Sequence, residues 1–534
     1  MANQKYIFVT GGVVSGIGKG ICAAAIGNLL KSSGIIVDAL KMDPYLNVDP
    51  GTMSPYEHGE VYVLADGKET DLDLGNYERF MDVNLDNISS TSSGVIYSEI
   101  IKKEREGAYL GKTVQIIPHV TDHIQDKFAY KKEGTEVKII EIGGSTGDIE
   151  AQVFLESLRQ FRVLKPNRVL HVHLGYIPFL SAVGEYKSKP MQNSIKELLG
   201  MGLQPDLVFL RYEKKEDLDI PTQLMEKIAL YCNVEPESVL KMPDLKSIYQ
   251  SPKHLLNNTK LLSSLSQFVG KELKPELSEF FENADIVYDK KINIALIAKY
   301  SGLCDSYSSI IESLKIAARY NNCCVNISII DSETEDLLDK MSSYDGFIVP
   351  GGFGKRGLEQ KIKAIEWIRI NKKPFLGICL GLQMAVVEFA RDVVGLKNAT
   401  SREINDNGVE SDLIIDYMPD QINQKIMGGT MRLGTYKCTL NDSSLAFSMY
   451  KTSTIFERHR HRLEVQNKFV PDLEACGMIV SGKHSIGESF LVEVVELKKE
   501  LHPYFIAIQS HPEFLSRPDK PHPLFNGLIQ ACIK

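Results

Sequence analysis

The chain has 534 residues, of which 43% are hydrophobic and 24% charged, and its formal net charge is -8. One hydrophobic core stops growing near ~250 to 300 residues, so this length predicts two large domains. The composition is that of a folded globular protein and excludes extensive disorder. The negative net charge argues against wholesale binding to nucleic acid or to an anionic membrane.

The sequence shows no targeting or membrane-spanning segment. The first ten residues lack the basic and apolar stretches of a signal peptide, and no run approaches the ~20 apolar residues that span a bilayer. We therefore expect a cytoplasmic protein. The nine cysteines are scattered without a C-x-x-C pair, which predicts neither a disulfide framework nor a zinc site.

The first half of the chain alternates β-rich runs with helical patterns, which predicts a parallel α/β sheet. Helices are expected at 21–33 and 152–164. The expected strands are 5–10, 35–42, 114–118, 137–142, 168–174 and 206–210.

A charge-rich stretch without a strand pattern, 269–290, predicts a linker between a domain at 1–268 and a second at 291–534. The α/β alternation restarts after it. The expected elements of the second domain are strands at 293–298, 345–349, 374–378 and 505–509 and helices at 308–320 and 359–371.

Cys379 is the first candidate for chemistry. It lies in the sequence Gly377-Ile378-Cys379-Leu380-Gly381, between an expected strand and an expected helix. Such a sharp turn exposes a nucleophile at a helix N-terminus, where the dipole favours a thiolate. Taken alone, the pattern fits a buried cysteine between glycines equally well.

Two further motifs favour the nucleophile. The expected strand 505–509 runs into Ser510-His511-Pro512-Glu513, which brings together a base and a carboxylate that orients it. The segment Pro350-Gly351-Gly352-Phe353-Gly354 leaves backbone N–H groups open for an oxyanion, although an ordinary loop has the same composition.

Along the chain the three motifs follow one another as glycine loop, cysteine turn and His-Pro-Glu, and in that order they closely resemble the class I glutamine amidotransferases over the whole second domain. The resemblance implies that Cys379 attacks the glutamine amide, that His511 transfers protons and that Glu513 orients the histidine. The residues that it implies for glutamine and oxyanion binding are Gly352, Leu380, Gly381, Leu382, Gln383, Glu403 and Arg462.

The run Arg458-His459-Arg460-His461-Arg462 has the composition of a metal or nucleic-acid site. In an extended segment, alternation places its arginines on one face and its histidines on the other. We therefore favour one arginine contacting the substrate carboxylate, with the rest forming a packed or solvated face.

The first domain begins with a candidate phosphate-binding loop, because the expected strand 5–10 leads through Gly11 to Gly20 into a helix. Five residues separate Gly12 from Gly18, where four are usual, and Gly20 stands where a Ser or Thr would contact Mg²⁺. Magnesium would then need carboxylates, and Asp73 and Glu141 are candidates, although each alone also fits a surface carboxylate.

This loop resembles the dethiobiotin synthetase type of P-loop ligase. Further segments, at 41–53, 58–61, 143–150 and 187–192, are similar to signature segments of the CTP synthase family, and the similarity spans nearly the entire chain. It implies that ATP phosphorylates UTP at its 4-oxygen and that ammonia then displaces the phosphate. Lys19 and Lys41 would neutralise the transferring phosphoryl group, and Asp73 and Glu141 would hold Mg²⁺.

The resemblance also implies the nucleotide contacts. Those for ATP are Gly16, Ile17, Gly18, Lys19, Gly20, Ile21, Asp73, Pro243, Asp244 and Leu245. Those for UTP or the feedback inhibitor CTP are Ser15, Asp148, Ile149, Glu150, Lys187, Ser188, Lys189, Pro190, Met191, Gln192 and Lys227.

The same resemblance implies allosteric activation by GTP near 352–357, an internal ammonia passage and a homotetramer. The chain departs from the common family pattern at Ser145-Thr146 and at Leu463, which would alter CTP inhibition or glutamine affinity without removing a reacting group. Two alternatives are a cobyric-acid-type synthetase, which activates carboxylates, and a non-catalytic partition ATPase. Cys379, His511 and Glu513 weigh against the second.

Overall fold

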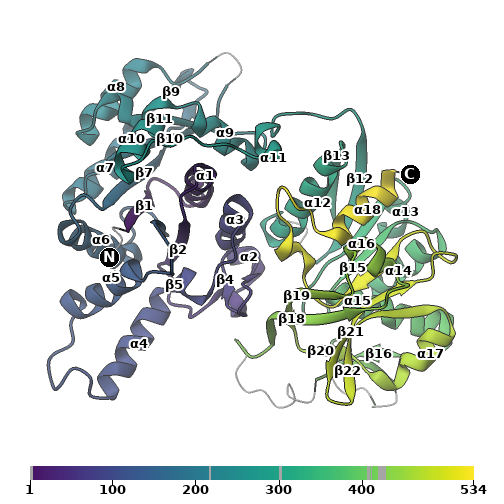
Figure 1. Cartoon of the computed structure of the whole chain (residues 1–534). Coiled ribbons are helices and arrows are strands. Elements are labelled where there is room, and N and C mark those ends of the chain that lie inside the picture. Colours follow the sequence, from purple (N-terminus) through teal and green to yellow (C-terminus); the bar gives the residue numbers. More distant parts are fainter. Residues whose placement is uncertain are drawn as a thin grey trace. The chain divides into compact units, whose positions relative to one another are not determined.

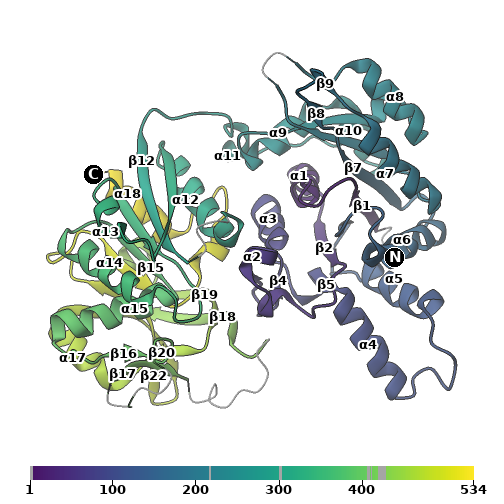
Figure 2. The same ribbon diagram turned by 180° about the vertical axis from the view of Figure 1, so that it is seen from behind.

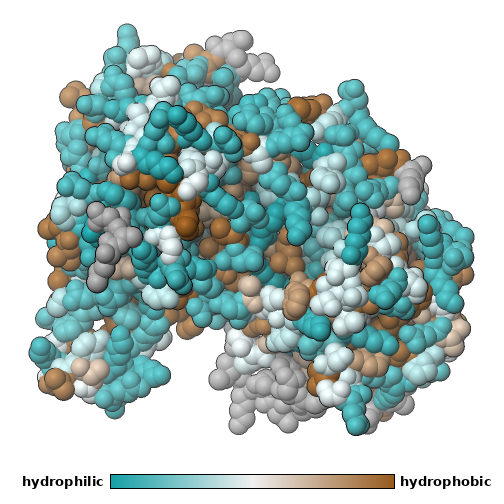
Figure 3. Space-filling model, viewed as in Figure 1, coloured by the Kyte–Doolittle hydropathy of each residue, from teal (hydrophilic) through white to brown (hydrophobic). Residues whose placement is uncertain are grey.

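The computed structural model describes residues 4–215, 218–299, 304–405, 409, 412–418 and 429–533. Its contacts divide the chain into two compact units, Met1–Asp49 with Asp73–Ile286 and Pro50–Leu72 with Val287–Lys534. In both, helices flank a central sheet (Figures 1 and 2), and the surface seen in Figure 3 is mostly hydrophilic with scattered apolar residues. Among the described residues, no helix combines the length and the apolar character needed to cross a membrane.

The first unit is built on a parallel seven-stranded sheet in the order β11-β10-β7-β1-β6-β2-β5. On one face, Tyr6 and Phe8 of β1 pack against Phe128 and Phe161 of the covering helices. The strands are β1 (Lys5–Gly11), β2 (Val37–Asp43), β5 (Ser90–Ser92), β6 (Val137–Ile142), β7 (Val169–Tyr176), β10 (Leu207–Tyr212) and β11 (Val239–Pro243). The main helices are α1 (Lys19–Ser32), α3 (Leu72–Met81), α4 (Ser93–Arg105), α5 (Thr121–Ala129), α6 (Gln152–Leu164), α7 (Lys189–Gly200), α8 (Thr222–Cys232), α9 (Ser251–Leu256) and α10 (Thr259–Val269).

The predicted strand at 114–118 is wrong. The chain there enters an irregular helical turn, Ile116–Val120, that leads into α5. Ile116 and Ile117 are 49% and 53% exposed, so these β-branched residues do not pack in a sheet. Pro118 also has no N–H to donate to a strand ladder. The other five predicted strands of this half and both helices are confirmed, with ends shifted by a few residues at most.

The second unit contains a nine-stranded mixed sheet in the order β13-β12-β14-β15-β23-β22-β21-β18-β19. The first five strands are parallel and the last four join antiparallel. The strands are β12 (Lys291–Ala298), β13 (Cys324–Asp331), β14 (Gly346–Val349), β15 (Phe375–Ile378), β18 (Arg432–Leu440), β19 (Thr454–His461), β21 (Met478–Ile486), β22 (Ser489–Leu497) and β23 (Phe505–Ile508). The main helices are α12 (Ser308–Tyr320), α14 (Leu358–Ile370), α15 (Leu380–Phe389), α16 (Leu445–Tyr450), α17 (Val470–Ala475) and α18 (Pro523–Ile533).

The segment Pro50–Leu72 belongs to the second unit by its contacts, although it lies inside the stretch expected as the first domain. It forms the short strands β3 (Tyr62–Val63) and β4 (Glu69–Thr70). The Tyr62 hydroxyl donates to the carbonyl of Phe514 at 2.9 Å. Glu60 accepts a hydrogen bond from the Ser309 backbone N–H at 3.0 Å. These partners are hundreds of positions apart in the sequence, so no local pattern could predict that this segment packs with the second unit.

Candidate functional site

Cys379 occupies the sharp turn between β15 and α15. Its backbone φ of 52° lies in the left-handed region, which residues other than glycine seldom adopt. Its N–H donates to Ile508 O at 2.7 Å. A residue held in this strained conformation is typical of a functional site. Cys379 is the N-cap residue of α15, and the N–H groups in the first turn of a helix have no acceptor within that helix.

The two flanking glycines make this turn possible. A Cβ on Gly377 would lie 2.9 Å from the backbone of Gly381 and 2.8 Å from Ala507 Cβ. A Cβ on Gly381 would run into the carbonyl oxygen of Val349. Both positions thus require glycine because backbone, rather than a mobile side chain, occupies the space.

His511 and Glu513 form the expected pair, with 2.7 Å between His511 Nδ1 and Glu513 Oε1. Burial opposes protonation of the imidazole, but Glu513 and Cys379 together raise the pKa of His511 to about 10. The protonated imidazolium is thus favoured. The ring stacks on Phe514, with centroids 5.2 Å apart.

Gly351 closes this arrangement from the loop after β14. A Cβ there would lie 2.8 Å from His511 Cε1 and 3.6 Å from Cys379 Cβ. The structure therefore brings Cys379, His511 and the glycine loop together.

A cavity of about 640 Å³ opens beside Cys379 and collects most of the predicted glutamine-binding residues. The Glu403 carboxylate accepts a hydrogen bond from Gly354 N, and Arg462 donates to Thr430 Oγ1 at 2.7 Å. Leu380, Gly381 and Leu382 form the buried first turn of α15. The predicted residues that line the cavity are Gly352, Gln383, Glu403 and Arg462, together with the atypical Leu463.

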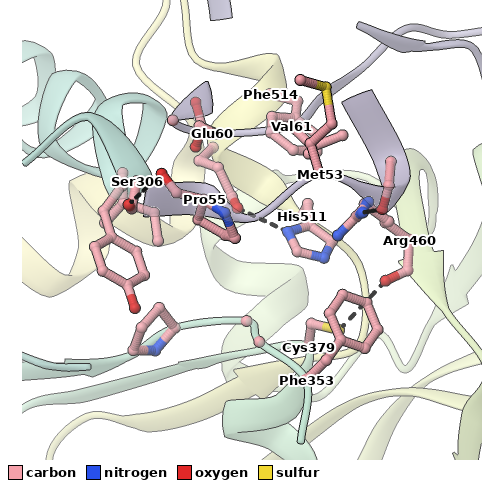
Figure 4. Close-up of a pocket in the computed structure, with 18 residues that line it drawn as sticks. Met53, Pro55, Glu60, Val61, Ser306, Phe353, Cys379, Arg460, His511 and Phe514 are labelled. Carbon is pink, nitrogen blue, oxygen red and sulfur yellow. Dashed lines mark hydrogen bonds and ion pairs between the residues drawn. The ribbon is translucent and has the colours of Figure 1, made fainter. Parts of the chain in front are cut away.

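A second cavity, of about 260 Å³, also reaches Cys379 and His511 (Figure 4). Met53, Pro55 and Val61, from the segment Pro50–Leu72, form part of its wall. The thiol thus faces two cavities.

The alternation of arginines and histidines in β19 is confirmed. Arg460 donates to Glu69 Oε1 at 2.7 Å and lies over the Phe353 ring, and Arg458 donates to Val63 O at 3.0 Å. On the opposite face, His459 Nδ1 and His461 Nε2 are 2.9 Å apart in a buried cluster. Sequence reasoning missed the partners in the segment Pro50–Leu72, and it also missed Gln509, whose Nε2 lies 3.6 Å from Cys379 Sγ.

In the first unit, the loop after β1 has the geometry of a phosphate cradle. Gly16 and Gly18 adopt φ values of 69° and 91°, which favour glycine. Lys19 begins α1, and its Nζ donates to Gly144 O at 2.6 Å. Burial lowers the pKa of Lys19, an effect that Glu141 partly offsets. An anionic ligand would supply the opposite charge that this buried ammonium needs.

Beside this loop, Lys41 pairs with both predicted metal carboxylates. Its Nζ lies 2.8 Å from Glu141 Oε1 and bonds to Asp73. Burial alone would lower the pKa of Lys41, but Asp73 and Glu141 raise it well above its usual value. A Cβ on Gly20 would overlap the Asp73 carboxylate, which explains the glycine at the place of the usual Ser or Thr.

These carboxylates fit Mg²⁺ that arrives with a nucleotide. Within the described ranges, no three His, Cys, Asp or Glu residues form a cluster suited to a metal. Mg²⁺ is commonly bound by one or two carboxylates together with substrate phosphates and water. The Asp73 carboxylate lies where the Cβ of a Ser or Thr at position 20 would be, so a carboxylate oxygen is available there as a donor for such an ion.

The remaining predicted nucleotide contacts fall into three groups. Asp148 accepts a hydrogen bond from Ser145 N at 2.6 Å, whereas Ile149 and Glu150 are exposed. Ser194 of α7 packs against Gly12, at the start of the loop that contains Ser15 and Ile17. Ile21 lies in α1. The segment that leads into α7 and forms its first turn contains Lys187, Ser188, Lys189, Pro190, Met191 and Gln192. Lys227 lies exposed on α8.

The expected adenine end, Pro243 to Leu245, adjoins a residue that the sequence did not single out. Arg211 donates to Pro243 O at 2.9 Å and pairs with Asp244 at 2.9 Å. Its guanidinium also lies within 4 Å of where a Cβ on Gly18 would be. Arg211 therefore links the phosphate loop to this segment.

Comparisons with known proteins agree with this architecture. Residues 5–270 match the family model described as CTP synthase N-terminus, and residues 302–531 match glutamine amidotransferase class-I. The CTP synthase of Caldanaerobacter subterraneus subsp. tengcongensis is 47% identical over 538 residues, which cover 99% of this chain and 98% of that protein.

Other relatives are similar over the same extent. The CTP synthase of Halalkalibacterium halodurans is 47% identical over 543 residues, covering 99% of both chains. That of Methanocaldococcus jannaschii is 46% identical over 551 residues, covering 100% of this chain and 99% of the relative. Because these matches extend along the chain from end to end, the chain belongs to the CTP synthase family.

Proposed function

We propose that this C–N ligase aminates UTP to CTP with ATP, using ammonia released from glutamine at Cys379. One observation supports the proposal. The same chain places Cys379, His511 and Glu513 around one cavity and, in its other unit, has a candidate phosphate-binding loop near Lys41, Asp73 and Glu141.

In the glutaminase reaction, the Cys379 thiolate attacks the side-chain carbonyl carbon of glutamine. His511 carries the proton that the leaving ammonia needs, and its raised pKa keeps that proton available. The resulting thioester is cleaved by water, which gives its proton to His511 and releases glutamate. Glu513 holds the imidazole through Nδ1, which leaves Nε2 for the reacting atoms.

The negative oxygen that forms at each addition step requires hydrogen-bond donors. The N–H of Leu380, at the first position of α15, has no acceptor within its own helix. The N–H of Gly352 is the second proposed donor, and a Cβ on Gly352 would lie 3.6 Å from the Leu380 side chain. Two such donors are a common oxyanion device.

In the synthetase unit, the proposed first step transfers the γ-phosphoryl group of ATP to the 4-oxygen of UTP. Lys19 and Lys41 neutralise charge on the transferring group, and positioning and electrostatics of this kind carry most phosphoryl-transfer catalysis. Mg²⁺ bound with ATP would neutralise further phosphate charge, held by Asp73 and Glu141. Ammonia then attacks carbon 4 of the phosphorylated UTP, and phosphate leaves.

The proposal extends to ligand contacts and regulation. We assign UTP, or inhibitory CTP, to the segments 148–150 and 187–192 together with Ser15 and Lys227, and the adenine of ATP to 243–245. GTP activates by binding near 352–357, the enzyme is a cytoplasmic homotetramer, and the 260 Å³ cavity begins the ammonia passage. These assignments follow the family resemblance.

The test is conversion of UTP by the purified protein with ATP, Mg²⁺ and glutamine, followed by the absorbance change from UTP to CTP, with and without GTP. We expect CTP, ADP, phosphate and glutamate in equal amounts. Glutamine hydrolysis without any CTP would refute the proposal. Amidation of an added carboxylate substrate in place of UTP would instead favour the cobyric-acid-type alternative.

A further inference from the structure

The side-chain amide of Gln509 contacts both Cys379, the proposed nucleophile, and Gln383, a residue that lines the 640 Å³ cavity. Gln509 directly follows β23 and is 0% exposed. Its Nε2 lies 3.6 Å from Cys379 Sγ, and its Oε1 accepts a hydrogen bond from Gln383 Nε2 at 3.3 Å. Gln383, unlike Gln509, lines the 640 Å³ cavity.

The direction of these hydrogen bonds is fixed by a backbone carbonyl. Gln383 Nε2 also donates to Leu463 O at 3.1 Å, and a carbonyl oxygen can only accept. The NH₂ end of Gln383 therefore faces both Leu463 O and Gln509. Gln509 must then turn its oxygen to Gln383 and its N–H to the sulfur.

An N–H aimed at sulfur favours the charged form of a thiol. Because Gln509 and Cys379 are both buried, with 0% and 4% exposure, little water competes for this contact. The sulfur also lies 3.8 Å from Arg460 O, and the charged groups that interact with it are His511, which favours the thiolate, and Glu464, which opposes it. We propose that Gln509 is a positioning residue that stabilises the Cys379 thiolate and connects it to Gln383. This inference rests on the proposed role of Cys379 as the glutaminase nucleophile.

The chain of contacts also connects substrate and nucleophile. Gln383 lines the cavity proposed for the substrate glutamine, so it stands at one end of this series of contacts, and Cys379 stands at the other end. Gln509 thereby acts on the reaction through Cys379 and without touching the substrate.

Two variants separate this role from simple packing. Gln509→Met keeps the length of the side chain but removes the N–H donor, and Gln509→Glu keeps its shape but adds a carboxylate. The measurement is the rate at which iodoacetamide alkylates Cys379 in the full chain, from acidic to alkaline pH. Cys379→Ala identifies the signal of this thiol among the others, and Gln360→Met, on the exposed surface of α14, is the matched control.

We expect the midpoint of the alkylation profile to rise by about one pH unit in Gln509→Met, which is about tenfold less thiolate below the midpoint. It rises further in Gln509→Glu, and the alkaline limiting rate stays within about twofold. Unchanged midpoints in both variants would overturn the inference, since a structural role predicts lower thermal stability alone. If alkylated Cys379 still allowed glutamine hydrolysis, the proposed nucleophile would be wrong instead.

Discussion

Replacing Gly351 by alanine tests the packing between the glycine loop and the histidine. The φ of Gly351 is not positive, so alanine fits its backbone and the effect is purely steric. The new Cβ would lie 2.8 Å from His511 Cε1. Ordinary carbon–carbon contacts are about 3.5 to 4.0 Å, so the ring or the loop must move by about 0.7 to 1.2 Å.

His511 has little freedom to absorb this shift. Its Nδ1 is held by Glu513 at 2.7 Å, and its ring stacks on Phe514. A misplacement of about 1 Å in a catalytic group costs about 100-fold in rate. Overpacking lowers the free energy of unfolding by about 1 to 3 kcal/mol, which leaves a folded protein to assay.

The assay is glutamine hydrolysis, with kcat and KM determined separately. We expect kcat to fall about 100-fold in Gly351→Ala with a smaller change in KM, because the cavity residues stay in place. Gly200→Ala is the control, since its Cβ would meet nothing within 4 Å. A kcat within about threefold of the unmodified protein would refute the steric argument.

Three other predictions follow from the site and the core. Cys379→Ala should abolish CTP synthesis from glutamine but retain synthesis from added ammonia, and equal loss of both would contradict separate sites. Glu141→Gln should reduce ammonia-dependent synthesis at least about 100-fold, because Lys41 loses a partner at 2.8 Å and the proposed Mg²⁺ site loses a carboxylate. Activity near the normal rate would remove Glu141 from the proposed site.

Lys361 is 0% exposed, its Nζ has no hydrogen-bond partner, and burial lowers its pKa to about 7. Between pH 7 and about 10, Lys361 binds more protons in the unfolded chain than in the folded one. The loss of folding stability caused by burying this lysine therefore becomes smaller as the pH rises. Lys361→Met should therefore raise the free energy of unfolding at pH 7 by a few kcal/mol, since each unit of pKa shift corresponds to about 1.4 kcal/mol. Above about pH 10 we expect no gain in stability. A gain that is the same at every pH in denaturant titrations would show that packing alone is responsible.

Elements with a strong local period could be predicted from the sequence. The strand Val137–Ile142 and the helices Gln152–Leu164 and Ser308–Tyr320 have the predicted ends, because each carries its own apolar pattern. The antiparallel strands β18, β21 and β22 were not predicted. Their pairing depends on distant neighbours, which a local pattern does not contain.

In the candidate site, too, residues in local motifs could be predicted, whereas residues that depend on distant contacts could not. Cys379, His511 and Glu513 stand in short motifs, and the structure brings them together. Gln509 lies beside one of these motifs, but its role depends on where its amide points. Nothing in the sequence around Glu69 distinguishes it from other charged residues. Its role depends on Arg460, which lies almost 400 positions later in the sequence and donates a hydrogen bond to it.

The segment Pro50–Leu72 has a practical consequence for dividing the protein. A fragment beginning at 291 would contain every glutaminase residue but would leave the buried Arg458 without Val63 O and Arg460 without the Glu69 carboxylate. It would also remove Met53, Pro55 and Val61 from the wall beside the thiol. The unit that contains the proposed glutaminase residues is thus discontinuous in the sequence, and a cut at the apparent domain boundary would separate it from 23 of its own residues.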